Sequence, residues 1–516
     1  MTRGLVSLTH SASALNLPRA AAPAVLRPMP SLHVRTAGGR AGASSLRVIP
    51  AAEPYAGIRL TEVLGALSYA LDLTEGQPMG HSVRTTMIGM RIGEQLGLSD
   101  DQRSALFYTL LLKDLGCSSN ASRLSNLFGA DDRVLKQAHK LIDWTDTRDV
   151  ARYALKHAKP GQSRLSRAVH ALSLGRKAKG IGQEMIATRC ERGAEIARTL
   201  SLPKGCAEAI FALDEHWDGN GLPFGLRGSA IPMLARIAGL AQTVEVFADA
   251  FDVQTAYEVA HKRRGRWFDP VLVDCLDAFR LDGKFWGELR QADTLASLQG
   301  YEPPDRVVFA DELRLDTVAE AFAKVIDAKS PFTARHSQNV AFLASRTAKE
   351  MGMSAREVRG IRRAALLHDV GKLSVSNSIL DKPSALDADE TAEVRKHTWY
   401  TYEILSRVTR FQRFAPLAAA HHERIDGTGY HLGLSGDELS MSARILAAAD
   451  ICEALSSDRP YRKGMEIDGV LSRLEELVAA GHLCPVATEA LTGWFGGIED
   501  APDELSLVQD STSLIS

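Results

Sequence analysis

The 516-residue sequence predicts an all-α protein made of two tandem copies of one helical bundle. Two observations support this fold class. Apolar residues recur at helical spacing, and the strict alternation typical of half-buried strands is nearly absent. In addition, residues 99–116 align without gaps with residues 354–371. A repeat of this kind indicates that one structural module occurs twice in the chain.

Each copy of the repeated segment opens with the same helix-start pattern. Ser99 is followed three residues later by Gln102, and Ser354 is followed three residues later by Glu357. In such a capping box the hydroxyl accepts a hydrogen bond from a first-turn amide, and the longer side chain reaches back to the amide of the cap. We therefore expect a helix to begin directly after each serine.

The spacing between the copies changes along the chain. The offset is 255 residues for the capped helix, but residues 214–221 align with residues 422–429 at an offset of 208. The first copy therefore carries about 47 extra residues, located between 118 and 182. Pro303 and Pro304 cannot continue a helix and mark the boundary between the copies.

Four segments follow from the repeat and from composition. Residues 1–50 contain six Arg, five Pro and no Asp or Glu, which favours a disordered tail. The alternatives are an organelle-type presequence or a start assigned too far upstream. We expect a first domain over 51–300, a second over 306–500 and a short tail over 501–516.

Bulk properties exclude several classes of protein. The net charge of −2 and the pI near 6.7 argue against a nucleic-acid-binding protein. No apolar run is long enough to span a membrane. Six widely spaced cysteines without a CxxC pair indicate reduced thiols in a cytoplasmic protein.

A candidate site lies in the second copy, where six of the fifteen histidines fall between His336 and His431. His368-Asp369 stands at the end of the capped helix. His421-His422 ends an apolar run before a glycine-rich turn. We further expect His397 to follow a polar helix over 388–396, and Asp450 to end a buried helix over 445–449.

This combination of side chains suits particular metals. Imidazole and carboxylate ligands without thiolates favour Fe, Mn, Zn or Co. Two such ions close together are a common means of hydrolysing phosphodiesters, since they activate water and neutralise the attacking and leaving oxygens.

His368-Asp369 and the stretch HHERIDGTGY (421–430) resemble the two defining motifs of the HD-GYP family, a branch of the HD phosphohydrolases. The similarity continues through His336, His397, Asp450 and residues 457–462, and it covers about 315–491. It implies two tandem HD-type bundles, of which the second binds two or three divalent metals, often iron or manganese. It also implies hydrolysis of cyclic di-GMP to pGpG or GMP.

The resemblance assigns roles residue by residue. It implies one metal on His336, His368, Asp369 and Asp450, a second on His397, His421 and His422 with Asp369 bridging, and a third-metal position at Asp327. It implies a catalytic role for Asp369 and Lys372, and substrate contacts from Lys372, Gly429, Tyr430, Arg459 and Arg462. The sequence departs from the family pattern at His431, where the motif has proline.

Most ligand positions are altered in the first copy. Lys113 replaces His368, and the positions of His397, His421, His422 and Asp450 hold Arg189, Leu213, Asp214 and Gln242. A lysine there would repel a divalent cation and could pair with Asp114. We therefore expect no metal in the first copy, which is either a structural remnant or a regulatory or dimerising module.

The sequence thus leads to one main hypothesis and two alternatives. The main hypothesis is a metal-dependent cyclic di-GMP phosphodiesterase. The first alternative is an HD phosphohydrolase for another cyclic dinucleotide or nucleotide. The second is a non-catalytic nucleotide receptor that signals through the first copy, as a homodimer or with a signalling partner.

Overall fold

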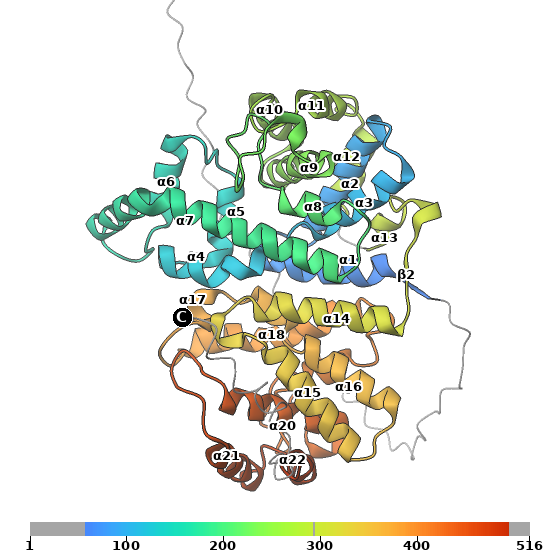
Figure 1. The fold of residues 1–516 in the computed structure, drawn as a ribbon. Helices are drawn as coiled ribbons and strands as arrows, with labels where there is room; N and C mark the ends of the chain where they lie inside the picture. The colour runs from blue at the N-terminus through green and yellow to red at the C-terminus, as the bar shows by residue number, and fades with distance from the viewer. Residues whose placement is uncertain (1–56, 293–294, 495–516) are drawn as a thin grey trace, which may run out of the picture. The chain divides into compact units, whose positions relative to one another are not determined.

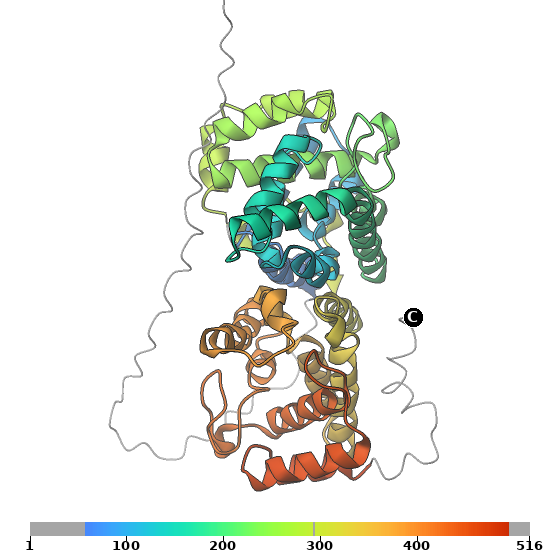
Figure 2. The ribbon, with the colours of Figure 1, turned by 90° about the vertical axis from the view of Figure 1, so that its left-hand side faces the viewer.

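The computed structural model describes residues 57–292 and 295–494. The predicted tails, 1–50 and 501–516, lie outside the described residues. Within the described residues, helices form nearly all of the regular structure (Figures 1 and 2). The two strands, β1 (Ile58–Arg59) and β2 (Phe309–Ala310), pair antiparallel with Ile58 opposite Ala310. The predicted all-α fold class is confirmed.

The first half runs from α1 to α13. Its elements are α1 (Leu60–Thr74), α2 (His81–Gln95), α3 (Asp100–Leu112), η1 (Cys117–Asn120), α4 (Ala121–Phe128), α5 (Asp132–Lys140), α6 (Thr147–His157), α7 (Arg164–Thr199), α8 (Cys206–Phe211), η2 (Gly228–Ala230), α9 (Met233–Ala250), α10 (Val253–Lys262), α11 (Pro270–Asp277), α12 (Gly283–Leu289) and α13 (Leu295–Gln299).

The second half runs from η3 to α22. Its elements are η3 (Pro304–Arg306), α14 (Glu312–Asp327), η4 (Pro331–Thr333), α15 (His336–Glu350), α16 (Ala355–Leu367), η5 (Val370–Ser374), α17 (Asn377–Leu380), α18 (Ala388–Ser406), α19 (Ala415–Ala419), η6 (Gly436–Glu438), α20 (Met441–Ser456), α21 (Ile467–Ala479) and α22 (Pro485–Thr492).

The helix boundaries follow the predicted repeat. Helices α2 and α3 begin and end 255 residues before α15 and α16, and η2 lies 208 residues before η6. The capping boxes at Ser99 and Ser354 are both present. At the offset of 255 residues α17 falls within α4, so the extra residues of the first copy form α5, α6 and the beginning of α7.

Two helices extend further than predicted. The helix expected to end at residue 396 continues as α18 to Ser406, so His397 lies within it. Likewise Asp450 lies inside α20, which continues to Ser456. The predicted ends lie where a polar run stops, before His397, and where an apolar run meets a carboxylate, at Asp450. Both side chains are buried, and the helix continues through each of them.

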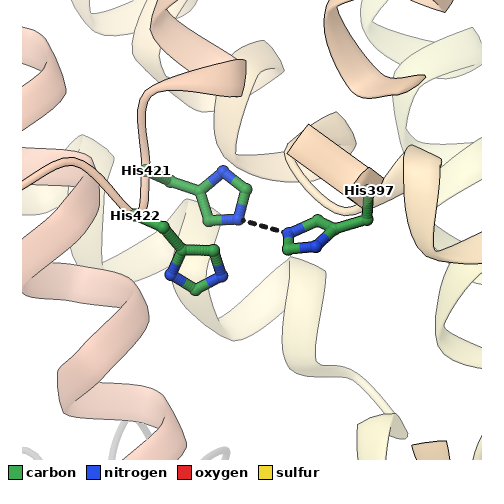
Figure 3. Close-up of side chains that lie close together, drawn as sticks. All are labelled: His397, His421 and His422. Carbon is green, nitrogen blue, oxygen red and sulfur yellow. Dashed lines mark hydrogen bonds between the residues drawn. The ribbon is translucent and has the colours of Figure 1, made fainter. Parts of the chain in front are cut away.

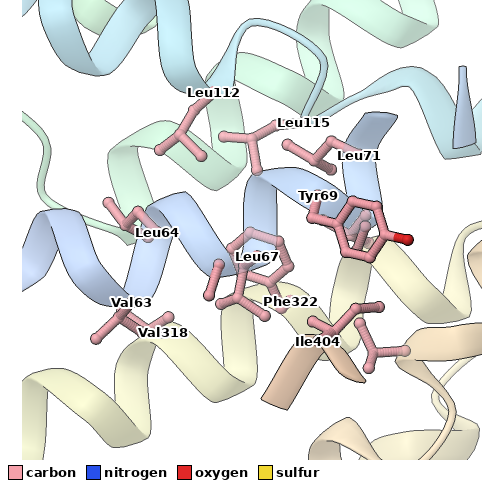
Figure 4. Close-up of a cluster of buried hydrophobic side chains, with 14 of the residues drawn as sticks. Val63, Leu64, Leu67, Tyr69, Leu71, Leu112, Leu115, Val318, Phe322 and Ile404 are labelled. Carbon is pink, nitrogen blue, oxygen red and sulfur yellow. The ribbon is translucent and has the colours of Figure 1, made fainter. Parts of the chain in front are cut away.

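Helix α1 lies at the centre of the core. Thirteen of its fifteen residues are buried, as expected for a helix that is covered on all sides. Figure 4 shows Val63 and Leu67 of α1 beside Val318 and Phe322 of α14, with Leu112 on the other side. Full burial of a side chain of this size contributes about 1.5–3 kcal/mol.

This packing joins the two halves. A single apolar cluster includes residues of both copies, and the chain from Gly57 onward groups as one compact unit. The boundary predicted between 300 and 306 therefore follows the repeat and is not marked by a break in the core. Among the described helices none has both the length and the apolar character needed to cross a bilayer.

Candidate metal centre

Seven predicted ligands lie close together in the second half, brought there by five helices. All are buried except His422, which is partly exposed. The seven are His336 at the start of α15, His368 and Asp369 just after α16, His397 within α18, His421 and His422 just after α19, and Asp450 within α20.

One group of ligand atoms surrounds His336 and His368, whose Nε2 atoms are 3.3 Å apart. The Oδ2 atom of Asp369 lies 3.5 Å from the first and 3.4 Å from the second. The Oδ1 atom of Asp450 lies 3.4 Å and 3.6 Å from the same two nitrogens. These two imidazoles and two carboxylates could bind one metal ion.

A second group is formed by His397, His421 and His422 (Figure 3). The Nε2 atoms of His397 and His421 are 3.1 Å apart. Each of these nitrogens is 3.6 Å from Oδ1 of Asp369. The two oxygens of Asp369 therefore face different imidazole groups, which is the arrangement of a carboxylate that bridges two metals.

The hydrogen bonds made by Nδ1 of the imidazole rings determine which ring nitrogen is free to bind a metal. Nδ1 donates to a backbone carbonyl three residues earlier in His368, His397 and His421, at 2.6–2.7 Å. Since a carbonyl can only accept, Nδ1 carries the proton and Nε2 keeps its lone pair. Such hydrogen bonds commonly orient histidine ligands.

Glu453 does the same for His336, because its carboxylate accepts from Nδ1 of this ring. It was not predicted as a site residue. The repeat contains the signal, since Glu245 occupies the matching position of the first half and contacts His81 in the same way. A carboxylate kept in both copies, three residues after Asp450 or its counterpart, could have been noticed.

The pKa values differ between the two imidazole groups. Burial lowers the pKa of His397 to about 3 and also lowers the pKa of His421 and His422, so these rings are neutral. Burial acts in the same direction on His336, but Glu453 and Asp369 outweigh it and hold its pKa well above the usual value. The carboxylates around His336 thus favour a positive charge at this end of the site.

The chemistry of the donor set also fits divalent metals. Asp369 is 1 % exposed, and its Oδ1 has no hydrogen-bond partner among the described residues, although a buried carboxylate oxygen normally has one. The oxygen faces the lone pairs of two neutral imidazoles, which cannot satisfy it. Nitrogen and carboxylate ligands in this ratio suit Fe, Mn, Zn or Co.

Asp327 lies at the end of α14, where its carboxylate accepts from the backbone N–H and the hydroxyl of Ser337, the hydroxyl at 2.6 Å. It therefore caps α15 and orients the helix that begins with His336. Within the described residues Asp327 belongs to none of the clusters able to hold a metal. Its third-metal role stays a prediction.

The predicted cationic residues occupy different environments. Lys372 donates from Nζ to Oδ2 of Asp369 at 2.6 Å, at the edge of the ligand set. Arg459 lies 3.4 Å from the carboxylate of Glu453. Arg462 donates to the carbonyls of Ala454 and Leu455 at the end of α20, so these hydrogen bonds tie it to the helix end. Substrate contacts by the two arginines stay predictions.

The predicted glycine-rich turn, which leads to Gly429 and Tyr430, packs against the second imidazole group. The ring of Tyr430 is 4.8 Å from that of His422, and the Arg395 guanidinium lies over its face at 5.0 Å. A Cβ at Gly429 would collide with the backbone of Glu423, so this glycine permits a close approach of two chain segments.

The backbone conformation at residue 431 accounts for the absence of the proline that the family motif has there. Its φ is +118°, a conformation that proline, with φ near −65°, cannot adopt. The loop that follows is held by Glu423, whose carboxylate accepts from the amides of Leu432, Gly433 and Leu434 at 2.7–3.1 Å. Sequence reasoning did not single out Glu423, although its counterpart Glu215 holds the matching loop in the first half.

The first half contains cations at the equivalent place. Lys113 pairs with Oδ2 of Asp114, as predicted, and its Nζ is 3.1 Å from Nε2 of His81. Lys140 lies 3.8 Å from Oδ1 of the same carboxylate and 2.9 Å from Glu75. Each oxygen that faces an imidazole group in the second half thus faces an ammonium group here.

Cys117 approaches the same carboxylates, but burial raises the pKa of its thiol well above the usual value, which disfavours the thiolate that binds metals. Arg189, at the position of His397, pairs with Asp214. The expectation that the first half binds no metal stays a prediction, which these charges support.

Comparisons with known proteins agree with this geometry. The family model for the HD domain matches residues 163–272 and 320–483, so it covers parts of both halves. The 3′3′-cGAMP-specific phosphodiesterase 3 of Vibrio cholerae is 42 % identical over 417 residues, which are 81 % of this chain and 90 % of that protein.

A cyclic di-GMP phosphodiesterase response regulator of Xanthomonas campestris is 40 % identical over 154 residues, 30 % of this chain and 41 % of that protein. Among solved structures, a cyclic GMP-AMP-specific phosphodiesterase of V. cholerae superposes with a TM-score of 0.58 at 37 % identity, covering 87 % of this chain and 99 % of that one. The chain therefore belongs to the HD domain family, in its HD-GYP branch, with a degenerate HD-like repeat in its first half.

Proposed function

We propose that this chain is a metal-dependent phosphodiesterase that hydrolyses a cyclic dinucleotide, with 3′3′-cGAMP as the preferred substrate. The observation that carries the reaction type is Asp369, whose two oxygens face separate imidazole groups. The substrate rests on the V. cholerae relative and structure named above, which match most of the chain and are specific for cyclic GMP-AMP.

The ligand set divides between two divalent ions, with iron or manganese as the first choice. His336, His368 and Asp450 would hold one ion, and His397, His421 and His422 the other, with Asp369 between them. When bound, such ions lower the pKa of a coordinated water and neutralise phosphate oxygens.

The protein side chains supply orientation and charge. Carbonyl and Glu453 hydrogen bonds fix the imidazole rings, so the site is organised before substrate arrives. Lys372 places a cation beside Asp369, where it can stabilise negative charge that develops on the phosphate. Arg395 is exposed and lies over the Tyr430 ring at 5.0 Å, so its guanidinium offers a plane on which a purine base can stack.

Cyclic di-GMP is the second candidate substrate, because two relatives named as cyclic di-GMP phosphodiesterases match 28–30 % of this chain at 40 % identity. The two substrates differ in one base only, so the ligands and Lys372 would act alike on both. The difference between them must arise where the bases bind.

The test is turnover of 3′3′-cGAMP and cyclic di-GMP by the purified full chain, loaded with Mn²⁺ or Fe²⁺. We expect a higher kcat/KM for 3′3′-cGAMP, loss of turnover in Asp369→Asn, and normal turnover in Asp468→Asn, which changes an exposed carboxylate of α21. Absence of turnover of either substrate by the metal-loaded protein would overturn the proposal. Tight binding without turnover would instead favour a receptor.

A further inference from the structure

The segment that carries Lys372 lies against the first half of the chain. It consists of η5 and α17 and follows Asp369 directly, so its position determines where the Lys372 ammonium lies. A Cβ at Gly371 would collide with the carbonyl of His397, so this side of the segment packs tightly on α18. The other side is contacted by helix α5, which belongs to the 47-residue insertion of the first half.

Two consecutive residues at the start of α5 make these contacts. The Oδ1 atom of Asp132 accepts from the backbone N–H of Asn377 at 2.9 Å. The guanidinium of Arg133 donates to the carbonyl of Ser374. Together they hold the backbone at the junction of η5 and α17, two and five residues after Lys372.

The surroundings of Asp132 show a built contact. Its side chain is fully buried, with Nζ of Lys329 at 3.6 Å and Nζ of Lys136 at 3.4 Å. Burial alone would raise its pKa, but these ammonium groups hold the pKa below the usual value. Asn377 is fixed further, since its Nδ2 donates to the carbonyl of Lys329 at 2.7 Å and to Asp381 at 2.8 Å.

The far end of α5 is anchored in the first half. Lys140, its last residue, lies 2.9 Å from Glu75 and 3.8 Å from Asp114. Lys136 donates to the carbonyl of Thr74 at 3.0 Å. Helix α5 is thus tied at one end to Asp114, the first-copy counterpart of Asp369, and at the other to the segment beside the candidate metal centre.

We propose that Asp132 and Arg133 are positioning residues for the reaction, which hold the η5–α17 segment so that Lys372 lies beside Asp369. The proposal rests on the proposed phosphodiesterase function. It also gives the insertion a role, since in the described part of the second copy α17 is followed directly by α18, with no helix between them. Because a shift of about 1 Å in a catalytic group can cost about 100-fold in rate, loss of these contacts lowers kcat more than it changes KM.

The test uses the full chain with its metals bound and compares Asp132→Asn, Asp132→Ala, Arg133→Ala and Arg133→Lys. The control is Asp146→Ala, which removes the N-cap of α6 in the same insertion, at an exposed position. For each protein we would measure metal content, kcat, KM and hydrogen–deuterium exchange of peptides that cover 370–380.

We expect Arg133→Ala and Asp132→Ala to lower kcat by about tenfold or more, with little change in KM or metal content and with faster exchange over 370–380. Arg133→Lys keeps one donor for Ser374 and should recover part of kcat. Asp146→Ala should match the wild type in all four measurements.

Wild-type kcat and wild-type exchange in both alanine variants would overturn the proposal. A lower kcat with unchanged exchange over 370–380 would also overturn it, because the effect would then not pass through this segment. If Asp132→Ala does not fold, Arg133→Ala and Asp132→Asn decide. If the wild type hydrolyses no cyclic dinucleotide, the proposed function fails, while the exchange data still test whether α5 holds the segment.

Discussion

At the scale of single residues, the position of a candidate ligand depends on the side chains that orient it. His336 is the first residue of α15 and depends on two carboxylates from other helices. Asp327 caps the helix through Ser337, and Glu453 accepts the Nδ1 proton of the ring. Asp327 thus sets the position of the helix start, and Glu453 sets the orientation of the ring. Together they determine where Nε2 of His336 points.

Glu453 provides a prediction at this scale. Its replacement in Glu453→Gln removes the charge that fixes the ring and tautomer of His336. Since changes of this kind commonly cost 10–100-fold, we expect metal affinity to fall by about that factor while the fold is kept. Titration with Mn²⁺ followed by metal analysis measures the effect.

The control is Glu475→Gln, at an exposed position of α21, which should bind metal like the wild type. Equal metal affinity in the two variants would show that Glu453 does not orient His336.

At the scale of elements, the same connection between two helices occurs twice. Asp72 at the end of α1 accepts from the backbone N–H and hydroxyl of Ser82 and from the amide of Gly80 at the start of α2. Asp327 makes the corresponding contacts with Ser337 between α14 and α15. In the first half this link persists although the ligands around it have changed, so its role there is structural.

The link in the first half predicts a pH dependence. Burial raises the pKa of Asp72 to about 7, above the value of 3.8 expected in the unfolded chain. The folded state thus binds this proton more tightly, so the contribution of Asp72 to stability is full below about pH 4 and is lost as the pH rises to about 7.

We therefore expect the unfolding free energy of the wild type to fall relative to that of Asp72→Asn between pH 4 and pH 7, and the difference to level off above. Urea unfolding at several pH values measures this. Asp468→Asn, at an exposed position, serves as the control. A difference that is constant or rises over this range would contradict the assignment.

At the scale of the whole molecule, the two copies use one framework for different purposes. In the second half the two oxygens of Asp369 face imidazoles, whereas in the first half those of Asp114 face Lys113 and Lys140. Fixed ammonium groups thus stand at the positions where the proposed divalent ions would bind in the second half. Since both halves share one apolar cluster, the first half also covers part of the second.

This contrast predicts opposite effects of one substitution at matched positions. Asp114→Asn leaves two buried ammonium groups without their shared partner, which should lower the unfolding free energy by about 3–5 kcal/mol. Its metal content should equal that of the wild type. Asp369→Asn should instead lose bound metal.

Urea unfolding and metal analysis of both variants, side by side, measure these effects. Loss of metal from a folded Asp114→Asn protein would show that the first half also binds metal, and the interpretation of Lys113 and Lys140 would be wrong.

The sequence by itself determined the all-α class, the repeat with its two offsets, and the ligand residues that the structure brings together. Helix caps and motif spacing involve residues close together in the sequence, so they can be recognised without knowledge of the fold. Glu453 and Glu423 show the limit, since a carboxylate that orients a ligand or a loop looks like any other acidic residue. The helices through His397 and Asp450 are longer than predicted, because neither the end of a polar run at His397 nor a carboxylate in an apolar run at Asp450 interrupts the backbone hydrogen bonds.

Only the tertiary structure decided which distant groups meet. Lys140 and Asp132 lie in an insertion with no internal counterpart, so no repeat could place one beside Asp114 and the other beside Asn377. The φ of His431, +118°, is likewise a value that the residue type by itself does not predict. Such contacts depend on how whole helices pack, and packing is determined by the summed burial of many side chains, which no local pattern records.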